Sequence, residues 1–244
     1  MRSWRNPLTS GLCKGGRRSH HCGVTPQGLI FDLDGTLVDS LPGIATSLNR
    51  ALASSGLPPH SLGAIRGFIG NGARVLVSRA APEGADEPLL TLIEREFKAD
   101  YDLTWVHGTT AYPGVAALLA KLQQTEIPLA VLSNKPHGFT TAMVSGLFPT
   151  VAFAAVLGQR PGIPHKPDPA GAFEIAALLG VPAQAGMVIG DSTMDIETAR
   201  RAGMRAVAVS WGYHDRASLV AASPDALIDS PAELLGLLAH VKAL

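Results

Sequence analysis

The sequence predicts an α/β protein with a doubly wound, Rossmann-like parallel sheet as its core and an inserted helical cap. From residue 29 onward, short apolar runs alternate with longer helical patterns, which is typical of a parallel sheet covered by helices. After the first apolar run, about seventy residues contain only amphipathic helical patterns and no strand-like run. We therefore expect residues 29–38 and 113–244 to form the core and residues 39–112 to form the cap.

Six apolar runs are candidate strands. They are residues 29–31, 129–132, 151–157, 187–189, 206–209 and 226–228. In the predicted cap, apolar residues recur at intervals of three and four in the segments 44–53, 75–80 and 89–97, which indicates helices with one buried face.

The composition bounds the kinds of partner that the protein can have. The chain has 244 residues, 46% of them hydrophobic, which is enough for a core domain and a smaller inserted one. Its twenty basic and twenty acidic side chains cancel, so the overall charge favours neither nucleic acid nor an anionic membrane as a partner. No apolar stretch reaches the length of a membrane span. A monomer and a homodimer both remain open.

Residues 1–28 differ from the rest of the chain. They carry five basic residues and no acidic one, and they lack the apolar run of a secretion signal. Cys13 and Cys22 lie here beside His20 and His21, but their spacing matches no regular zinc pattern, so a disordered leader is the preferred interpretation. Because the rest of the chain has no cysteine, a cytoplasmic location is expected.

Polar residues follow the apolar runs at the points where the predicted strands end. Asp32 and Asp34 follow the first run, Ser133 and Asn134 follow the second, and Asp191 follows the run at 187–189. In an open parallel sheet these strand ends emerge on one edge, which is where ligands bind. The sequence therefore predicts one polar pocket built from separate segments.

Three acids in one pocket indicate a metal site. Close carboxylates repel one another unless a cation or a shared proton lies between them, and oxygen ligands in an incomplete protein cage suit Mg²⁺. Lys166, in a loop between prolines, is the candidate for the cation that completes a phosphate site.

These residues suggest a route for phosphate transfer. A carboxylate oxygen of Asp32 attacks phosphorus to give an aspartyl-phosphate, while Mg²⁺ and Lys166 neutralise the transferring group. Asp34 donates a proton to the leaving alkoxide and then activates the water that hydrolyses the intermediate. Ser133 and Asn134 can donate hydrogen bonds to the phosphoryl oxygens.

Four segments resemble the motifs of the haloacid-dehalogenase-like phosphatases, in the same order and with similar spacing. They are residues 32–40 (DLDGTLVDS), 133–136 (SNKP), 166–169 (KPDP) and 190–195 (GDSTMD). Residues 112–115 (YPGV) and 69–74 (IGNGAR) look like the phosphoglycolate phosphatase branch of that superfamily. The resemblance covers residues 29 to about 240.

The resemblance implies a role for each matching residue. Asp32 would be the nucleophile and a metal ligand, Asp34 would be the acid/base and give its backbone carbonyl to Mg²⁺, and Asp191 would be the third ligand. Thr36, Ser133, Asn134 and Lys166 would surround the phosphate, and Asp195 would orient Lys166 or a metal-bound water. The substrate would be a small phosphate monoester, with 2-phosphoglycolate preferred.

Other activities are disfavoured on single residues. Dehalogenases lack a second aspartate such as Asp34, and phosphonatases need a cap lysine, whereas the only cap lysine here is Lys98 in an ordinary amphipathic pattern. Phosphomutase relatives usually differ around Asp191, and a non-catalytic regulatory module has no need of the full set of acids. A phosphatase of a sugar phosphate, a nucleotide or pyrophosphate remains an alternative.

The evidence for the substrate comes from the predicted cap. Arg66 and Arg74 flank a glycine-rich loop that could fold over the pocket, so either could pair with a substrate carboxylate, although both could equally lie on solvated helix faces. Gly43 departs from the family, because relatives commonly carry an acidic residue there. The segment 211–213, Trp-Gly-Tyr, is expected to pack beneath the site.

Overall fold

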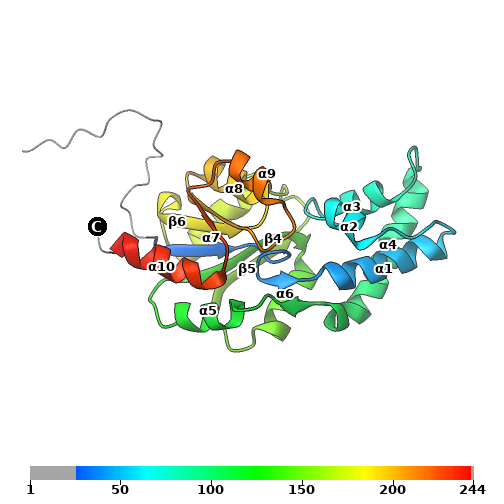
Figure 1. The fold of residues 1–244 in the computed structure, drawn as a ribbon. Coiled ribbons are helices and arrows are strands. Elements are labelled where there is room, and N and C mark those ends of the chain that lie inside the picture. The colour runs from blue at the N-terminus through cyan, green and yellow to red at the C-terminus, as the bar shows by residue number, and fades with distance from the viewer. Residues whose placement is uncertain (1–25, 243–244) are drawn as a thin grey trace, which may run out of the picture.

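The computed structural model describes residues 26–242 and shows a sheet of six parallel strands (Figure 1). The strands are β1 (Gly28–Phe31), β4 (Leu129–Pro136), β5 (Phe153–Gln159), β6 (Gly186–Gly190), β7 (Arg205–Val209) and β8 (Ala226–Ile228). Their order across the sheet is β5-β4-β1-β6-β7-β8, so β1 is central and the chain winds outward from it first to one side and then to the other. This reversal beside β1 is the switch point at which open α/β sheets bind ligands.

Both faces of the sheet are covered by helices, which explains why its strands are apolar throughout. Side chains alternate between the two faces, so Leu29 and Phe31 join one core cluster and Ile30 joins the other. The first cluster includes residues of α5 (Val115–Leu122), α6 (His137–Leu147) and α10 (Pro231–Lys242). The second includes residues of α7 (Ala170–Leu179), α8 (Thr193–Ala202) and α9 (Arg216–Ala221). A short 3₁₀ turn, Ala183–Ala185, precedes β6.

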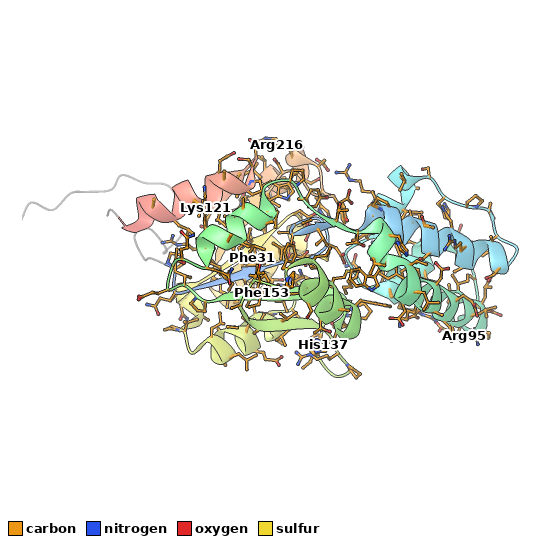
Figure 2. All side chains as sticks on the ribbon, turned by 90° about the horizontal axis from the view of Figure 1, so that it is seen from below. Phe31, Arg95, Lys121, His137, Phe153 and Arg216 are labelled. Carbon is orange, nitrogen blue, oxygen red and sulfur yellow. The ribbon has the colours of Figure 1, made fainter. Side chains whose placement is uncertain are left out.

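Four of the five helices between β1 and β4 project to one side of this core (Figure 1). They are α1 (Leu41–Ser54), α2 (Leu62–Phe68), α3 (Ala73–Ala80) and α4 (Glu87–Gly108), and α1 packs mainly along α4. Two short antiparallel strands, β2 (Val38–Asp39) and β3 (Thr110–Ala111), pair where the chain leaves and re-enters the core. Figure 2 shows the reach of this helical cap, with Arg95 far from Phe31 and Phe153 in the sheet.

Gly43 lies where α1 and α4 approach most closely. A β-carbon on Gly43 would lie 3.1 Å from the carbonyl oxygen of Gly108, and one on Gly108 would lie 2.5 Å from the α-carbon of Gly43. The packing of these helices therefore leaves little room for a side chain at position 43.

The predicted fold class is confirmed, and all six candidate strands form the parallel sheet. The pair β2 and β3 was not predicted, because two residues are too few to show an alternating pattern. The assignment of 39–112 as a separate domain stays a prediction.

Gly28, placed in the leader from the sequence, begins β1, while Cys13, Cys22 and their neighbouring histidines lie outside the described residues. Among the described residues, no helix combines the length and apolar character needed to cross a membrane.

Candidate active site

The predicted pocket lies at the carboxyl ends of β1, β4 and β6, beneath the cap. Its core side is lined mainly by polar residues and its cap side mainly by apolar ones. The polar core residues include Asp32, Asp34, Ser133, Asn134, Lys135, Lys166, Asp191 and Ser192, and the cap residues include Ile44, Ile69, Ala73, Leu76, Phe97 and Tyr101. Sequence positions more than 150 residues apart in the chain thus meet in one site, as the strand order requires.

Lys166 is the buried cation at the floor of this pocket. Its Nζ lies 2.8 Å from Asp32 Oδ1 and 2.6 Å from Asp195 Oδ1, and it donates to the carbonyl oxygen of Leu132 at 3.1 Å. Three oxygens therefore account for the three hydrogens of the ammonium group. Lys166 is consequently fixed in place beside Asp32, with only 5% of its surface exposed.

Asp195 holds Lys166 and also caps a helix. Its Oδ2 accepts hydrogen bonds from the backbone nitrogen of Ser192 at 3.1 Å and from Ser192 Oγ at 2.5 Å, while Ser192 Oγ accepts from the backbone nitrogen of Asp195. This reciprocal capping box starts α8 and positions the carboxylate rigidly. Both Asp195 oxygens are therefore used by protein donors.

Asp191 is enclosed by two backbone segments. Thr36 Oγ1 donates to its Oδ1 at 3.0 Å and the backbone nitrogen of Tyr213 donates to its Oδ2 at 2.7 Å. A β-carbon on Gly35, where φ is +87°, would overlap this carboxylate, and one on Gly212 would overlap its Cβ. Only glycines allow such an approach, and at Gly35 the backbone conformation also favours glycine.

Burial changes the pKa values of the two most important carboxyl groups. Desolvation raises the pKa of Asp32 to about 8, although the charge of Lys166 opposes the change and those of Asp195 and Asp191 add to it. Desolvation and the charge of Asp195 raise the pKa of Asp191 to about 7, against the hydrogen bonds from Tyr213 and Thr36. Around Lys166, the close carboxyl groups of Asp32, Asp191 and Asp195 thus outnumber the one ammonium group beside them.

The donor set fits a hard divalent cation. Carboxylate oxygens of Asp32, Asp191 and Asp195 lie within 4.8 Å of one another, and all three residues are buried. Asp195 accepts three hydrogen bonds, from Lys166 and from two donors of Ser192. Asp191 accepts one on each oxygen, and the described contacts of Asp32 are confined to Oδ1. Asp32 and Asp191 are therefore the side chains with more capacity left for a metal. All-oxygen ligands of this kind suit Mg²⁺ and similar ions.

Asp34 lines the same pocket and is held by two side-chain donors. Ser40 Oγ donates to its Oδ1 at 2.5 Å, and Lys135 Nζ lies 3.0 Å from Oδ1 and 3.1 Å from Oδ2. Lys135 Nζ also donates to the hydroxyl oxygen of Tyr101 in α4, at 3.1 Å. Burial tends to lower the pKa of the Lys135 ammonium, but Asp34 and Tyr101 outweigh it and raise the pKa above its usual value.

Lys135 and Tyr101 are the site residues that the sequence reasoning missed. Lys135 stands two residues after Ser133 in β4, so strand alternation aims both side chains at the same face of the sheet. This signal was present in the sequence. Tyr101 gave no such signal, because its place in an amphipathic helix explains a buried aromatic ring without a polar contact.

Asn134 lines the pocket beside Ser133, but its side chain binds backbone groups. Its amide donates to the carbonyl oxygens of Gly70 at 2.9 Å and Lys166 at 3.1 Å, and its carbonyl accepts from the backbone nitrogen of Lys166 at 2.8 Å. In this arrangement the side chain fastens the Lys166 loop to the cap, and neither of its donors is left for a phosphate. Ser133 lines the pocket, whereas the Thr36 hydroxyl is used by Asp191.

The two cap arginines occupy different environments. Arg66 donates through Nε to the carbonyl oxygen of Tyr213 at 2.9 Å and through a second nitrogen to that of Gly212. Arg74 instead pairs with Glu87 and, at 3.3 Å, with Glu94, and it is not among the residues that line the pocket. The structure therefore does not bring Arg74 to the predicted substrate site.

The segment 211–213 supports the site from below, as its sequence predicted. Trp211 Nε1 donates to the carbonyl oxygen of Thr36 at 3.0 Å. The hydroxyl of Tyr213 accepts from the backbone nitrogens of Ser40 at 2.9 Å and Leu41 at 3.1 Å, which ties the start of α1 to the core.

The α/β core carries a cap, and its pocket gathers buried acids around Lys166. This fold and this site place the chain among the phosphoric monoester hydrolases. Comparison with known proteins gives the family: the model of the haloacid dehalogenase-like hydrolases matches residues 29–209, and the chain belongs to that family. The resemblance seen in the motifs is thereby confirmed.

Relatives with this fold carry phosphatase names. A phosphoglycolate phosphatase of Pectobacterium atrosepticum is 35% identical over 217 residues, which cover 88% of this chain and 93% of the relative. One from Rhodospirillum rubrum is 38% identical over 195 residues, covering 77% and 81%. The crystal structure of a predicted phosphoglycolate phosphatase from Haemophilus somnus superposes with a TM-score of 0.82 at 31% identity, covering 87% of this chain and 98% of that one.

Proposed function

We propose that this protein is a Mg²⁺-dependent phosphatase that hydrolyses a small phosphate monoester through an aspartyl-phosphate on Asp32. The observation that carries the proposal is the placement of Asp32 against Lys166, 2.8 Å apart at the centre of a pocket that a cap covers. A nucleophile next to a fixed positive charge is what in-line transfer of a phosphoryl group requires.

The residues divide the chemistry between them. Asp32 attacks phosphorus, and Lys166 balances negative charge on the transferring group. Asp34 gives a proton to the leaving oxygen as its bond to phosphorus breaks, and then takes one from the water that releases phosphate from Asp32. Asp32, Asp191 and the backbone carbonyl of Asp34 would hold Mg²⁺, which when bound supplies positive charge to the phosphoryl oxygens.

The proposed substrate is 2-phosphoglycolate. Relatives that are 35% and 38% identical bear the name phosphoglycolate phosphatase, and they match this chain over most of their length. Helices α1, α3 and α4 place side chains over the pocket and close it on the cap side, which suits a small molecule.

A panel of phosphate monoesters tests this proposal. Release of inorganic phosphate would be measured as kcat/KM for 2-phosphoglycolate, sugar phosphates, nucleotides and pyrophosphate, with Asp32→Asn as the inactive control. We expect 2-phosphoglycolate to have the highest value. A higher kcat/KM for another compound would make that compound the proposed substrate in place of 2-phosphoglycolate. If none of the compounds released inorganic phosphate, the proposed function would be wrong.

A further inference from the structure

Lys135 is a second buried lysine in the pocket, distinct from Lys166, and nothing in the proposed chemistry uses it. It is 7% exposed and lies at the carboxyl end of β4. Its backbone is fixed as well, because its nitrogen donates to Ser133 Oγ at 3.2 Å and its carbonyl accepts from Thr140 Oγ1 at 3.2 Å. Removing an ammonium group from water costs free energy, so its burial here calls for a structural or functional explanation.

Its contacts join the proposed acid/base to the cap. The ammonium nitrogen lies 3.0 and 3.1 Å from the two oxygens of Asp34, 3.1 Å from the hydroxyl of Tyr101, and 4.7 Å from the centre of the Tyr101 ring. The Tyr101 ring is itself packed between elements, stacked on Phe97 of α4 at 5.5 Å and edge-on to Phe139 of α6 at 5.2 Å. Lys135 therefore has one partner in the core and one in the cap.

The two carboxylate oxygens of Asp34 differ in the number of side-chain donors that they accept. Oδ1 accepts from both Ser40 Oγ and Lys135, whereas Lys135 is the one side-chain donor to Oδ2 among the described contacts. Oδ2 is thus the oxygen with capacity left for the proton that moves to the leaving group and back from water. Lys135 keeps its own protons throughout, so its effect is on the direction of the carboxyl group.

We propose that Lys135 is a positioning residue for Asp34, and that Tyr101 completes its hydrogen bonding when the cap is seated on the core. The acid/base is then in its working orientation only with the cap closed over a substrate, which couples proton transfer to the exclusion of water. This inference rests on the proposed phosphatase function and deepens it.

The test compares two leaving groups, because protonation matters for an alkoxide and little for a nitrophenolate. The variants are Lys135→Met and Tyr101→Phe, with Lys121→Met on the exposed surface of α5 as the matched control. The value to measure is kcat/KM, which reports the steps up to transfer to Asp32, for 2-phosphoglycolate or another alkyl phosphate that the wild type hydrolyses and for 4-nitrophenyl phosphate.

We expect Lys135→Met to lower kcat/KM about 100-fold for the alkyl phosphate and less than about 10-fold for the aryl phosphate, since acid/base catalysis contributes factors of this size. Tyr101→Phe should show the same pattern at about 5-fold, and it removes a single oxygen, so it serves if Lys135→Met fails to fold. In an Asp34→Asn background, Lys135→Met should cause no further loss beyond about 2-fold.

Equal losses for the two substrates, or additive losses in the double variant, would overturn the inference. So would an effect confined to KM for carboxylate-bearing substrates, which would make Lys135 a receptor for the substrate's anionic group. If the wild type hydrolyses phosphate monoesters and Asp32→Asn does not, while both Lys135→Met and Tyr101→Phe behave as wild type, this inference fails and the proposed function stands. If the wild-type protein had no phosphatase activity, both the proposed function and this inference would be wrong.

Discussion

Lys166 and Asp32 form an ion pair of 2.8 Å at the end of β1, although the cap helices and the core elements from α5 to β5 lie between them in the sequence. The pair is anchored from behind by Asp195, 2.6 Å from the same ammonium group. The geometry of the nucleophile therefore depends on a lysine that three oxygens hold in one position.

Replacing Lys166 tests that dependence. Lys166→Met should lower kcat/KM by about 1,000-fold, in the range found when a donor to developing negative charge is removed. Lys166→Arg should recover little of the loss, because a larger planar guanidinium does not fit the buried position between Leu132, Asp32 and Asp195. Steady-state kinetics with circular dichroism as the folding control would show this, and near-wild-type activity in either variant would contradict it.

Metal binding should release protons, and its effect on stability should grow with pH. In the metal-free protein the pKa of Asp32 is raised to about 8 and that of Asp191 to about 7, from an ordinary value of 3.8. Between about pH 4 and pH 8 the folded state therefore holds more protons at these groups than the unfolded state, so their contribution to stability falls as pH rises. Mg²⁺ binds the ionised carboxylates of the folded state and offsets that loss.

The increase in Tm caused by Mg²⁺ should accordingly be larger at pH 8 than at pH 6. The difference between the two Tm values is the quantity to measure, because it cancels the titration of other groups. Asp191→Asn should remove most of the pH-dependent part. An increase in Tm that is the same at both pH values would contradict the assignment of the ligands.

Gly35 should be sensitive to substitution because of its contact with Asp191 and not only because of its backbone. Gly35 and Gly56 both have positive φ angles, +87° and +72°, but a β-carbon on Gly56 would meet nothing within 4 Å. Both alanine variants should lose about 1 kcal/mol of stability from backbone strain. Gly35→Ala should lose more, and should also weaken Mg²⁺ binding, whereas equal effects in denaturant titrations of the two variants would contradict this account.

Arg66 should matter for substrate binding and Arg74 should not. Arg66 donates to the carbonyl oxygens of Gly212 and Tyr213, and the backbone nitrogen of Tyr213 donates to Asp191. Arg66→Ala should therefore favour an open cap and raise KM about 10-fold with a smaller change in kcat. Arg74→Ala removes ion pairs with Glu87 and Glu94 inside the cap, so KM should change by less than about 2-fold. A larger effect of Arg74→Ala on KM would indicate that Arg74 contacts the substrate.

Much of the core site follows from the sequence because parallel strands bring their carboxyl ends to one edge. Asp32 and Asp191 were found in this way, whereas Lys166 was found as the cation that a phosphate site would need. The structure places Lys166 2.8 Å from Asp32, and a carboxylate oxygen of Asp32 lies within 4.8 Å of one of Asp191. The preceding apolar runs fix these positions, and the runs are strong enough to be recognised in a single sequence.

The contacts between the cap helices and the core could not be predicted from the sequence, because they depend on how these two parts of the chain pack against each other. Arg66 and Arg74 have similar sequence surroundings, yet one reaches the core and the other pairs with acids of α4. Asn134 was expected at the phosphate, but its amide is used by Gly70 and the Lys166 loop. Short-range patterns carry no information about such partners, which lie many residues away.

The most direct test of the central claim is to trap phosphate on Asp32. Wild-type protein mixed with 2-phosphoglycolate, or with whichever phosphate monoester it hydrolyses fastest, would be quenched in acid within one turnover and digested for mass spectrometry. We predict an added phosphoryl group on the peptide that contains Asp32, labile to hydroxylamine and absent in Asp32→Asn, which should also be inactive. Turnover without phosphate on that peptide, or an active Asp32→Asn protein, would contradict the claim.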